Sequence, residues 1–330
     1  MANAGTGRQN AVVAGAGTAL TQQALLVARK ELDALPDDDW MPSARGAVSH
    51  VIGLRSLSNS LVMKLFTADG SRSHSERERR ALALVGDYAG VPLPRLVTYG
   101  EIPAPRPVPY LIMTRLPGVR WADRRPRLTA AESLMLHRRA GSLLRQFHRE
   151  SQRHGPRPFG GLLNNDPNWP SLDEAVMERR EQLARRYRDH GGSAELIGQV
   201  ERFFTRRQHA LNSCQRTVLC HNDFIDGNLL VTAAGDPVIT GVIDFERASF
   251  DDPMADLAQT LRNATFHQPI GAEELAAAYG VDGADQERLA IHDLLHTLAE
   301  RVWISTDRPT GWRSSVRQLD AHLHCVSQRA

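Results

Sequence analysis

Short apolar runs separated by polar turns occupy the first third of the chain. Residues 47–56 and 58–66 are apolar and partly β-branched, so they predict two strands of a hairpin. Residues 91–100 and 108–116 predict two further strands. Residues 73–89 begin with Ser-His-Ser-Glu and then become apolar, which is typical of a capped helix. This part of the chain therefore predicts a small β-rich lobe with one main helix.

Helical spacing of apolar positions dominates after residue 118. The exception is 217–250, where two strand-like runs flank a turn at Ala233-Ala234-Gly235-Asp236. The loop 156–170, rich in Gly, Pro and Asn, is either a connector or a mobile cover. The helices expected from the spacing are 21–34, 129–153, 171–189, 193–212, 253–264, 284–305 and 311–328.

The change of pattern predicts an α+β fold with two lobes. We expect a small β-rich N-terminal lobe over 1–113, with 1–20 flexible, a hinge over 114–118 and a larger, mainly helical lobe over 119–330.

Composition narrows the class of protein. The 330 residues carry a net charge of +2, which argues against a dedicated nucleic-acid binder. We expect neither a signal peptide nor a membrane span, because no apolar stretch is long enough. The three cysteines form no CxxC pair, so we expect free thiols and a cytoplasmic location.

The segment LCHNDFIDGNLLV (219–231) concentrates polar groups between apolar runs. Its spacing, His221-x-Asp223-x-x-x-x-Asn228, suits phosphoryl transfer. A carboxylate at Asp223 would orient the attacking hydroxyl and accept its proton. Asn228 would be an oxygen ligand of Mg²⁺, and Asp244 in VIDFE would return beside it through a predicted hairpin.

Lys64 interrupts the apolar run LVMKLF. Only Lys30 and Lys64 among the 40 basic residues are lysines, so its presence in a strand is notable. We expect Lys64 to bind the α and β phosphates of a nucleotide and to pair with a glutamate of the next helix. Glu78 is favoured over Glu76, because Leu82 follows Glu78 at i+4 and should face the core.

Taken together, these motifs make the chain similar to the aminoglycoside phosphotransferase family, which also includes choline, fructosamine and homoserine kinase relatives. The similarity covers about residues 43 to 260. The segments that carry it are AVSHVIGL (47–54), Lys64, Glu78, VPLPRLV (91–97), PYLIMTRLPG (109–118), LLRQFHRE (143–150), LCHNDFIDGNLLV, VIDFE (242–246) and DDPMADLA (251–258).

This resemblance implies a protein-kinase-like fold, and it implies roles for further residues. Ser49 and neighbouring amides in the hairpin turn would cover the phosphates. Main-chain groups at Thr114 and Leu116 would bind the base, with Met113 packing beside it. Asp256 would brace the catalytic loop through its backbone or through His221.

Departures from protein kinases point to small hydroxylated substrates. The segment ARGAVSHV lacks GxGxxG, the catalytic loop reads His-Asn-Asp, and the metal motif reads Asp-Phe-Glu. Only about a dozen residues separate Asp244 from Asp256, too few for an activation segment that docks a peptide.

We therefore expect an enzyme that uses ATP or GTP with Mg²⁺ to phosphorylate a hydroxyl of a small molecule. The substrate would be an antibiotic: an aminoglycoside, or a less cationic nucleoside, macrolide or peptide type. The pI near 8.6 does not favour a polycation. A local acidic pocket of Asp226, Glu246, Asp251 and Asp252 could still bind one. The alternatives are a metabolic kinase and a non-catalytic binding module; the oligomer would be a monomer or homodimer.

Overall fold

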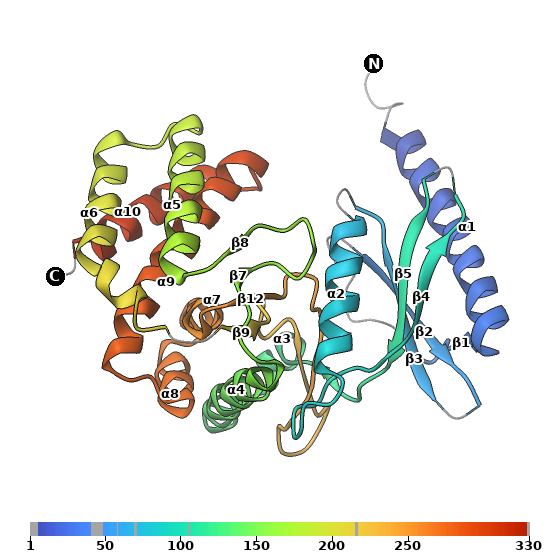
Figure 1. The fold of residues 1–330 in the computed structure, drawn as a ribbon. Coiled ribbons are helices and arrows are strands. Elements are labelled where there is room, and N and C mark those ends of the chain that lie inside the picture. Colours follow the sequence, from blue (N-terminus) through green and yellow to red (C-terminus); the bar gives the residue numbers. More distant parts are fainter. Residues whose placement is uncertain are drawn as a thin grey trace. The chain divides into compact units, whose positions relative to one another are not determined.

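The computed structural model divides the chain into two compact units (Figure 1). One comprises Met1–Gly86 with Leu93–Pro117, and the other comprises Asp87–Pro92 with Gly118–Ala330. The predicted α+β class is confirmed, with strands concentrated in the first unit and helices in the second. The lobe and hinge limits expected from the sequence stay a prediction. The residues described are 6–40, 49–57, 59–68, 71–104, 106–214 and 217–328, excepting the side chains of 6–18 and 71.

The amino-terminal unit is built on one antiparallel sheet, in the order β1-β2-β3-β5-β4. Its elements are α1 (Thr6–Leu32), β1 (Leu35–Pro36), β2 (Ser49–Arg55), β3 (Ser60–Phe66), α2 (Ser71–Val85), β4 (Leu96–Ile102) and β5 (Val108–Thr114). Figure 1 shows α1 and α2 on opposite faces of this sheet. The helix α1 begins well before the predicted start at residue 21, in an Ala-rich segment that favours helix.

Alternation along β3 sorts its side chains between these two faces. Leu61, Met63 and Leu65 are buried in one cluster with Ala24 and Ala28 of α1. The side chain of Lys64, between two of them in sequence, therefore belongs to the face that α2 covers.

Helices make up most of the carboxy-terminal unit. They are α3 (Trp121–Arg124), α4 (Ala130–Ser151), α5 (Leu172–Asp189), α6 (Ala194–Leu211), α7 (Pro253–His267), α8 (Pro269–Tyr279), α9 (Gly283–Asp307) and α10 (Trp312–Ser327), with short 3₁₀ turns at Arg125–Arg127 and Gln152–His154. The helices α5, α6, α9 and α10 share one hydrophobic core that includes Phe203 and Leu294.

The pattern of the sequence did not reveal α8, because its Ile-Gly-Ala-Glu-Glu-Leu-Ala-Ala-Ala run has no clear polar face. Its local signals are Pro269 in the first turn and Gly280 in the left-handed C-cap. The helix packs closely on α4: a Cβ added to Gly141 of α4 would lie 2.2 Å from the Leu275 carbonyl oxygen.

Two small sheets in this unit hold the segments between the helices. Their strands are β6 (Val119–Arg120), β7 (Phe159–Gly160), β8 (Asn168–Trp169), β9 (Val218–Cys220), β10 (Leu229–Val231), β11 (Ile239–Val242) and β12 (Ser249–Asp251). The orders are β11-β10-β6 and β8-β7-β12-β9. The segment 156–170 thus supplies a short hairpin to a sheet, which favours its role as a connector. Within the described residues no helix has the length and apolar character needed to cross a membrane.

Candidate active site

The loop between β9 and β10 brings together two of the predicted catalytic residues. The Nδ2 atom of Asn228 donates hydrogen bonds to the Asp223 Oδ2 at 2.9 Å and to the Asp223 carbonyl oxygen at 3.0 Å. The amide nitrogen is thereby engaged with Asp223, and the amide oxygen is the atom of Asn228 suited to a metal ion. Because Asp223 and Asn228 are five positions apart, these hydrogen bonds join the two ends of the catalytic loop.

The hairpin of β10 and β11 returns the chain to this loop. Leu229 pairs with Val242, and the Ile243 N–H donates to the Asn228 carbonyl oxygen at 3.0 Å. Asp244 follows at once, with a φ of 73° that is uncommon for a residue with a side chain. Such backbone strain is found preferentially at functional sites.

The pKa of Asp223 depends on its burial and on neighbouring charges, including that of Asp244. Burial raises the pKa of Asp223 above its ordinary value, and the charge of Asp244 raises it further. Arg247, His221 and the hydrogen bond from Asn228 act in the opposite direction. Two neighbouring carboxylates with an amide oxygen form a hard-oxygen donor set of the kind that suits Mg²⁺. The residues present therefore fit the expected metal.

The residue before Asp223 explains one departure from protein kinases. Asn222 has a φ of 59°, which Asn tolerates better than Arg. Its side chain donates to the Arg247 carbonyl oxygen at 3.0 Å and to Ser249 Oγ at 2.8 Å. An asparagine at this position therefore ties the loop to the segment after Asp244.

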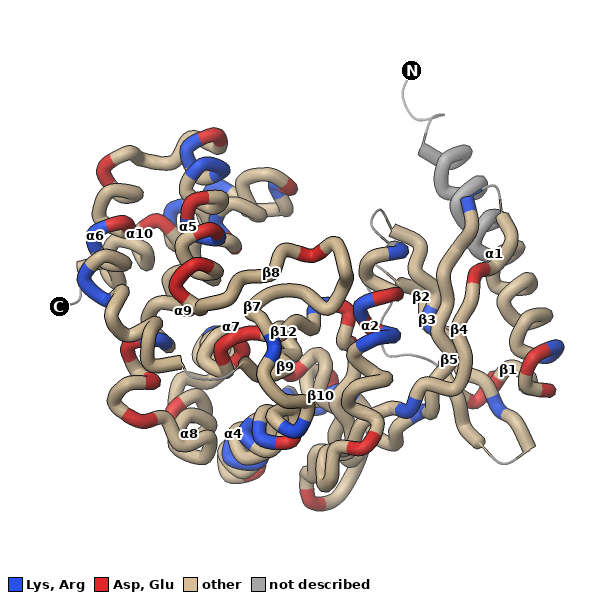
Figure 2. The backbone as a smooth tube through the Cα atoms, in the orientation of Figure 1, with Lys and Arg blue, Asp and Glu red and all other residues tan. Residues whose placement is uncertain are grey.

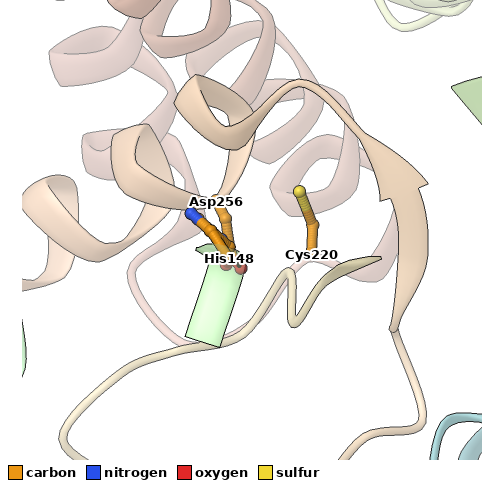
Figure 3. A group of neighbouring side chains, drawn as sticks. All are labelled: His148, Cys220 and Asp256. Carbon is orange, nitrogen blue, oxygen red and sulfur yellow. Dashed lines mark hydrogen bonds and ion pairs between the residues drawn. The ribbon is translucent and has the colours of Figure 1, made fainter. Parts of the chain in front are cut away.

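A buried cluster supports the loop from below, and Figure 3 shows His148 and Asp256 meeting beside Cys220. Asp256 accepts the backbone N–H groups of His221 at 2.6 Å and Asn222 at 2.9 Å. His148 Nε2 lies 3.2 Å from Asp256 and its Nδ1 lies 2.9 Å from the Tyr279 hydroxyl. The bracing that the resemblance implied for Asp256 is thus present.

Hydrogen bonds account for the ligand atoms of this cluster, so it supports the loop instead of forming a metal centre. Although burial acts to raise it, the pKa of Asp256 is lowered, chiefly by the hydrogen bond and charge of His148 and by His221. Burial raises the pKa of the Cys220 thiol, whose Sγ lies 3.4 Å from the Asp252 carbonyl oxygen. His221 also bonds through Nε2 to the Ile243 carbonyl oxygen at 3.0 Å.

In the amino-terminal unit, Lys64 Nζ lies 2.7 Å from Glu78 Oε2. Both side chains are buried, at 8% and 1% exposure. The fallback partner Glu76 instead binds Arg79 at 2.7 Å and Arg80 at 2.8 Å, and the Arg79 hydrogen bond is the main cause that lowers the pKa of Glu76 to about 2. The geometry selects Glu78 as the partner of Lys64.

The placement of Ser49 in the nucleotide site needs correction. Ser49 does not lie in the hairpin turn: it begins β2 and pairs with Phe66, at the opposite end of the strands from the Arg55–Ser60 pair. The Thr114 N–H donates to the Arg95 carbonyl oxygen at 2.9 Å, so of the Thr114 main-chain groups the carbonyl oxygen is the one that stays a predicted contact of the base.

Other nucleotide contacts keep their predicted status. Met113 is buried in β5 and the backbone of Leu116 stays a predicted contact. Most of ARGAVSHV, up to residue 48, lies outside the described residues.

The proposed substrate acids have structural partners. Asp226 forms an ion pair with Arg125. Asp252 is fully buried, caps α7 through the Met254 N–H at 3.1 Å and pairs with His292 at 3.1 Å. The expected substrate contact of Asp252 is therefore wrong, because this side chain is buried. The sequence contains a signal for its actual role, since Asp followed by Pro is typical of the start of a helix. Glu246 is half-buried, two residues after Asp244.

Two functional candidates were missed. Arg247 acts electrostatically on Asp223, and its place three residues after Asp244 was the available signal. Arg179 of α5 pairs with Asp251, a residue 72 positions away, and nothing in the local sequence indicates that contact.

Comparison with known proteins identifies the family and the fold. Residues 44–292 match the phosphotransferase enzyme family. Similar solved structures include a thermostable mutant of aminoglycoside phosphotransferase APH(4)-Ia, at 15% identity and TM-score 0.66, covering 92% of this chain and 98% of that chain. The GDP and kanamycin complex of APH(2")-IIia has 14% identity, TM-score 0.66 and coverages of 93% and 99%. The microcompartment-associated aminopropanol kinase has 18% identity, TM-score 0.63 and coverages of 94% and 95%.

The structural similarities confirm the predicted kinase-like fold, and the family match covers most of the chain. The chain therefore belongs to the phosphotransferase enzyme family, and it is an enzyme that transfers a phosphoryl group to a hydroxyl of a small molecule.

Proposed function

We propose that the protein transfers the γ-phosphoryl group of ATP or GTP to a hydroxyl of an antibiotic and so protects its host. The observation that carries the proposal is the hydrogen-bonded pair of Asp223 and Asn228, with Asp244 returned beside it by the β10–β11 hairpin. This arrangement offers a proton acceptor and a donor set for Mg²⁺ in one loop.

Asp223 is the residue proposed to orient the acceptor hydroxyl and take its proton. Its pKa is raised by burial, which makes the carboxylate a stronger base than an exposed aspartate. Asn228 restrains this carboxylate through its amide nitrogen. Asn228 and Asp244 would hold Mg²⁺, which supplies neutralisation of charge on the nucleotide phosphates.

Lys64 is proposed to bind the α and β phosphates. The buried carboxylate of Glu78 keeps the ammonium group in place, so little reorganisation is needed when the nucleotide binds. Positioning and charge stabilisation would therefore supply the rate enhancement, with no covalent intermediate on the protein. Because ATP and GTP are cytoplasmic and the three cysteines, all within the described residues, form no disulfide, we propose that the protein is cytoplasmic.

The acceptor class rests on similarity. Two of the similar solved structures are aminoglycoside phosphotransferases, which favours an antibiotic. A metabolic amino alcohol or sugar is the second candidate, favoured by the aminopropanol kinase.

A transfer assay tests the proposal. The protein is mixed with Mg²⁺ and γ-labelled ATP or GTP, and a panel of antibiotics and metabolites is examined for acceptor-dependent label transfer. We expect a labelled product with at least one hydroxylated acceptor and none after chelation of Mg²⁺. Nucleotide binding without transfer to any member would favour a non-catalytic binding module.

A further inference from the structure

A pocket beside the catalytic loop has features that bear on the charge of the acceptor. It has a volume of about 220 Å³ and lies within the carboxy-terminal unit. Its wall includes Asn222, the residue that precedes Asp223 in the chain, so the pocket borders the catalytic loop. The pocket is also lined by Arg179, Leu183, Asp251, Leu295 and His296.

A cation already neutralises the carboxylate in this pocket. Arg179 lies 2.5 Å from Asp251, and the two side chains are 29% and 3% exposed. The Arg179 side chain as a whole is therefore more accessible than the carboxylate that it covers. The Asp251 carboxylate is not available to a polycation unless Arg179 moves away.

Two further acids of the candidate set, Asp252 and Asp226, also have cationic partners. Asp252 lies 3.2 Å from Arg288 Nε and 3.1 Å from His292 Nε2. Asp226 pairs with Arg125. Three of the four acids that the sequence suggested for binding a cationic substrate thus have cationic protein partners. Figure 2 shows that α5, the helix of Arg179, carries both acidic and basic residues.

The remaining walls include apolar side chains, Gln182 and two histidines, of which His292 is the partner of Asp252. Leu183 and Leu295 supply hydrocarbon surface. His296 Nε2 lies 2.8 Å from the Ala255 carbonyl oxygen, and burial lowers the pKa of His296 to about 4, so this ring is neutral near pH 7. Its hydrogen bond identifies Nε2 as the donor and leaves Nδ1 as an acceptor for a hydroxyl.

We propose that this pocket binds an uncharged hydroxylated acceptor with an apolar portion and discriminates against polycationic acceptors. The proposal rests on the function proposed above, because the pocket matters only if Asp223 receives an acceptor. Because Arg179 and Asp251 together carry no net charge, the pocket offers an ammonium group no net attraction that would offset the loss of its hydration. A neutral hydroxyl is desolvated at a much smaller cost.

Binding of kanamycin by calorimetry tests this inference without requiring turnover. We expect weak binding to the wild-type protein. Arg179→Ala exposes the Asp251 carboxylate and should tighten kanamycin binding by roughly tenfold or more, with the gain disappearing at high salt. Arg188→Ala is the matched control, since it removes the same charge from α5 by breaking an exposed pair with Glu201. It should leave kanamycin binding unchanged.

A second variant separates exposed charge from altered folding. Arg179→Ala combined with Asp251→Asn removes both charges and should bind kanamycin as weakly as the wild type. If Arg179→Ala does not fold, tight and salt-sensitive kanamycin binding by the wild type still overturns the inference, and weak binding by the wild type and the double variant supports it. Equal affinities of a folded Arg179→Ala variant and the wild type would also overturn it.

The transfer assay distinguishes failure of this inference from failure of the proposed function. Phosphorylation of kanamycin with a higher kcat/KM than any neutral acceptor would overturn the inference and leave the enzyme assignment standing. We expect the best acceptor of the panel to carry no net positive charge, and its KM to be insensitive to NaCl.

Discussion

Two ion pairs of similar chemistry, one in each unit, differ in the roles that we infer for them. In the amino-terminal unit, Lys64 meets Glu78 at 2.7 Å; in the carboxy-terminal unit, Arg179 meets Asp251 at 2.5 Å. Each pair joins a carboxylate less than 5% exposed to a cation on another element. We infer that Glu78 holds a lysine ready for phosphate, whereas Arg179 cancels a carboxylate that would otherwise attract cations. The same contact can prepare a binding group or remove one.

Replacing Lys64 should have the largest effect in this comparison. Lys64→Met removes the proposed phosphate ligand, so we expect kcat/KM to fall by roughly 10²–10³, in line with loss of one charge-stabilising donor. Steady-state kinetics of label transfer give the measurement. Lys30→Met is the control, because it replaces the other lysine of the chain on an exposed turn of α1. Equal losses in both variants would contradict the assignment.

Breaking the second pair should cost stability. Arg179→Ala removes the cationic partner of Asp251, and we expect the free energy of unfolding to fall by about 1–3 kcal/mol. The value is below that of a fully buried pair because Arg179 is 29% exposed. Urea denaturation measures it. The double variant with Asp251→Asn should recover part of the loss; no recovery would mean that Arg179 stabilises the fold by packing alone.

The two pairs also differ in how far the sequence reveals them. A lysine in an apolar strand, followed by a helix with glutamates at two positions, restricts the partner to Glu76 or Glu78. The spacing of His221, Asp223 and Asn228 identifies the loop for the same reason: the chemistry is local. A contact across 72 residues, as between Arg179 of α5 and Asp251 of β12, depends on how a helix packs beside a sheet, and no nearby sequence pattern indicates it.

Long-range packing also explains the errors. The brace on the catalytic loop was predicted from family resemblance, but its extension through His148 to Tyr279 of α8 needed a helix that periodicity did not reveal. Asp252 was assigned to substrate because acids near a catalytic loop suggest a pocket. In the structure Asp252 is buried, and its carboxylate binds the Met254 N–H and Arg288 within the protein.

Acid should weaken the brace on the catalytic loop. The pKa of Asp256 is lowered from 3.8 in the folded protein, so the unfolded state binds more protons as the pH falls. Its contribution to stability is present above the unfolded pKa and is lost as the pH falls through the folded pKa.

We therefore expect Tm to fall more steeply for the wild type than for Asp256→Asn between about pH 5 and about pH 3. The two proteins should differ most near neutral pH. Asp236→Asn, at an exposed turn, should follow the wild-type curve. Parallel curves for the wild type and Asp256→Asn would mean that Asp256 is not ionised in the folded protein.

The smallest effect concerns the rejected partner of Lys64. Glu76 is 36% exposed and bonds to arginines on its own helix, so Glu76→Gln should change the free energy of unfolding by less than about 0.5 kcal/mol. Its transfer kinetics should match the wild type, whereas Glu78→Gln should lower kcat/KM. The reverse order would show that Glu76 orients Lys64 during turnover.

The central claim is that Asp223 is the proton acceptor for phosphoryl transfer, and single-turnover transfer by Asp223→Asn tests it most directly. With saturating acceptor and labelled nucleotide, we predict a rate roughly 10²–10⁴ lower than the wild type, with unchanged nucleotide affinity. Asp236→Asn serves again as the control. A near wild-type transfer rate for Asp223→Asn would contradict the account.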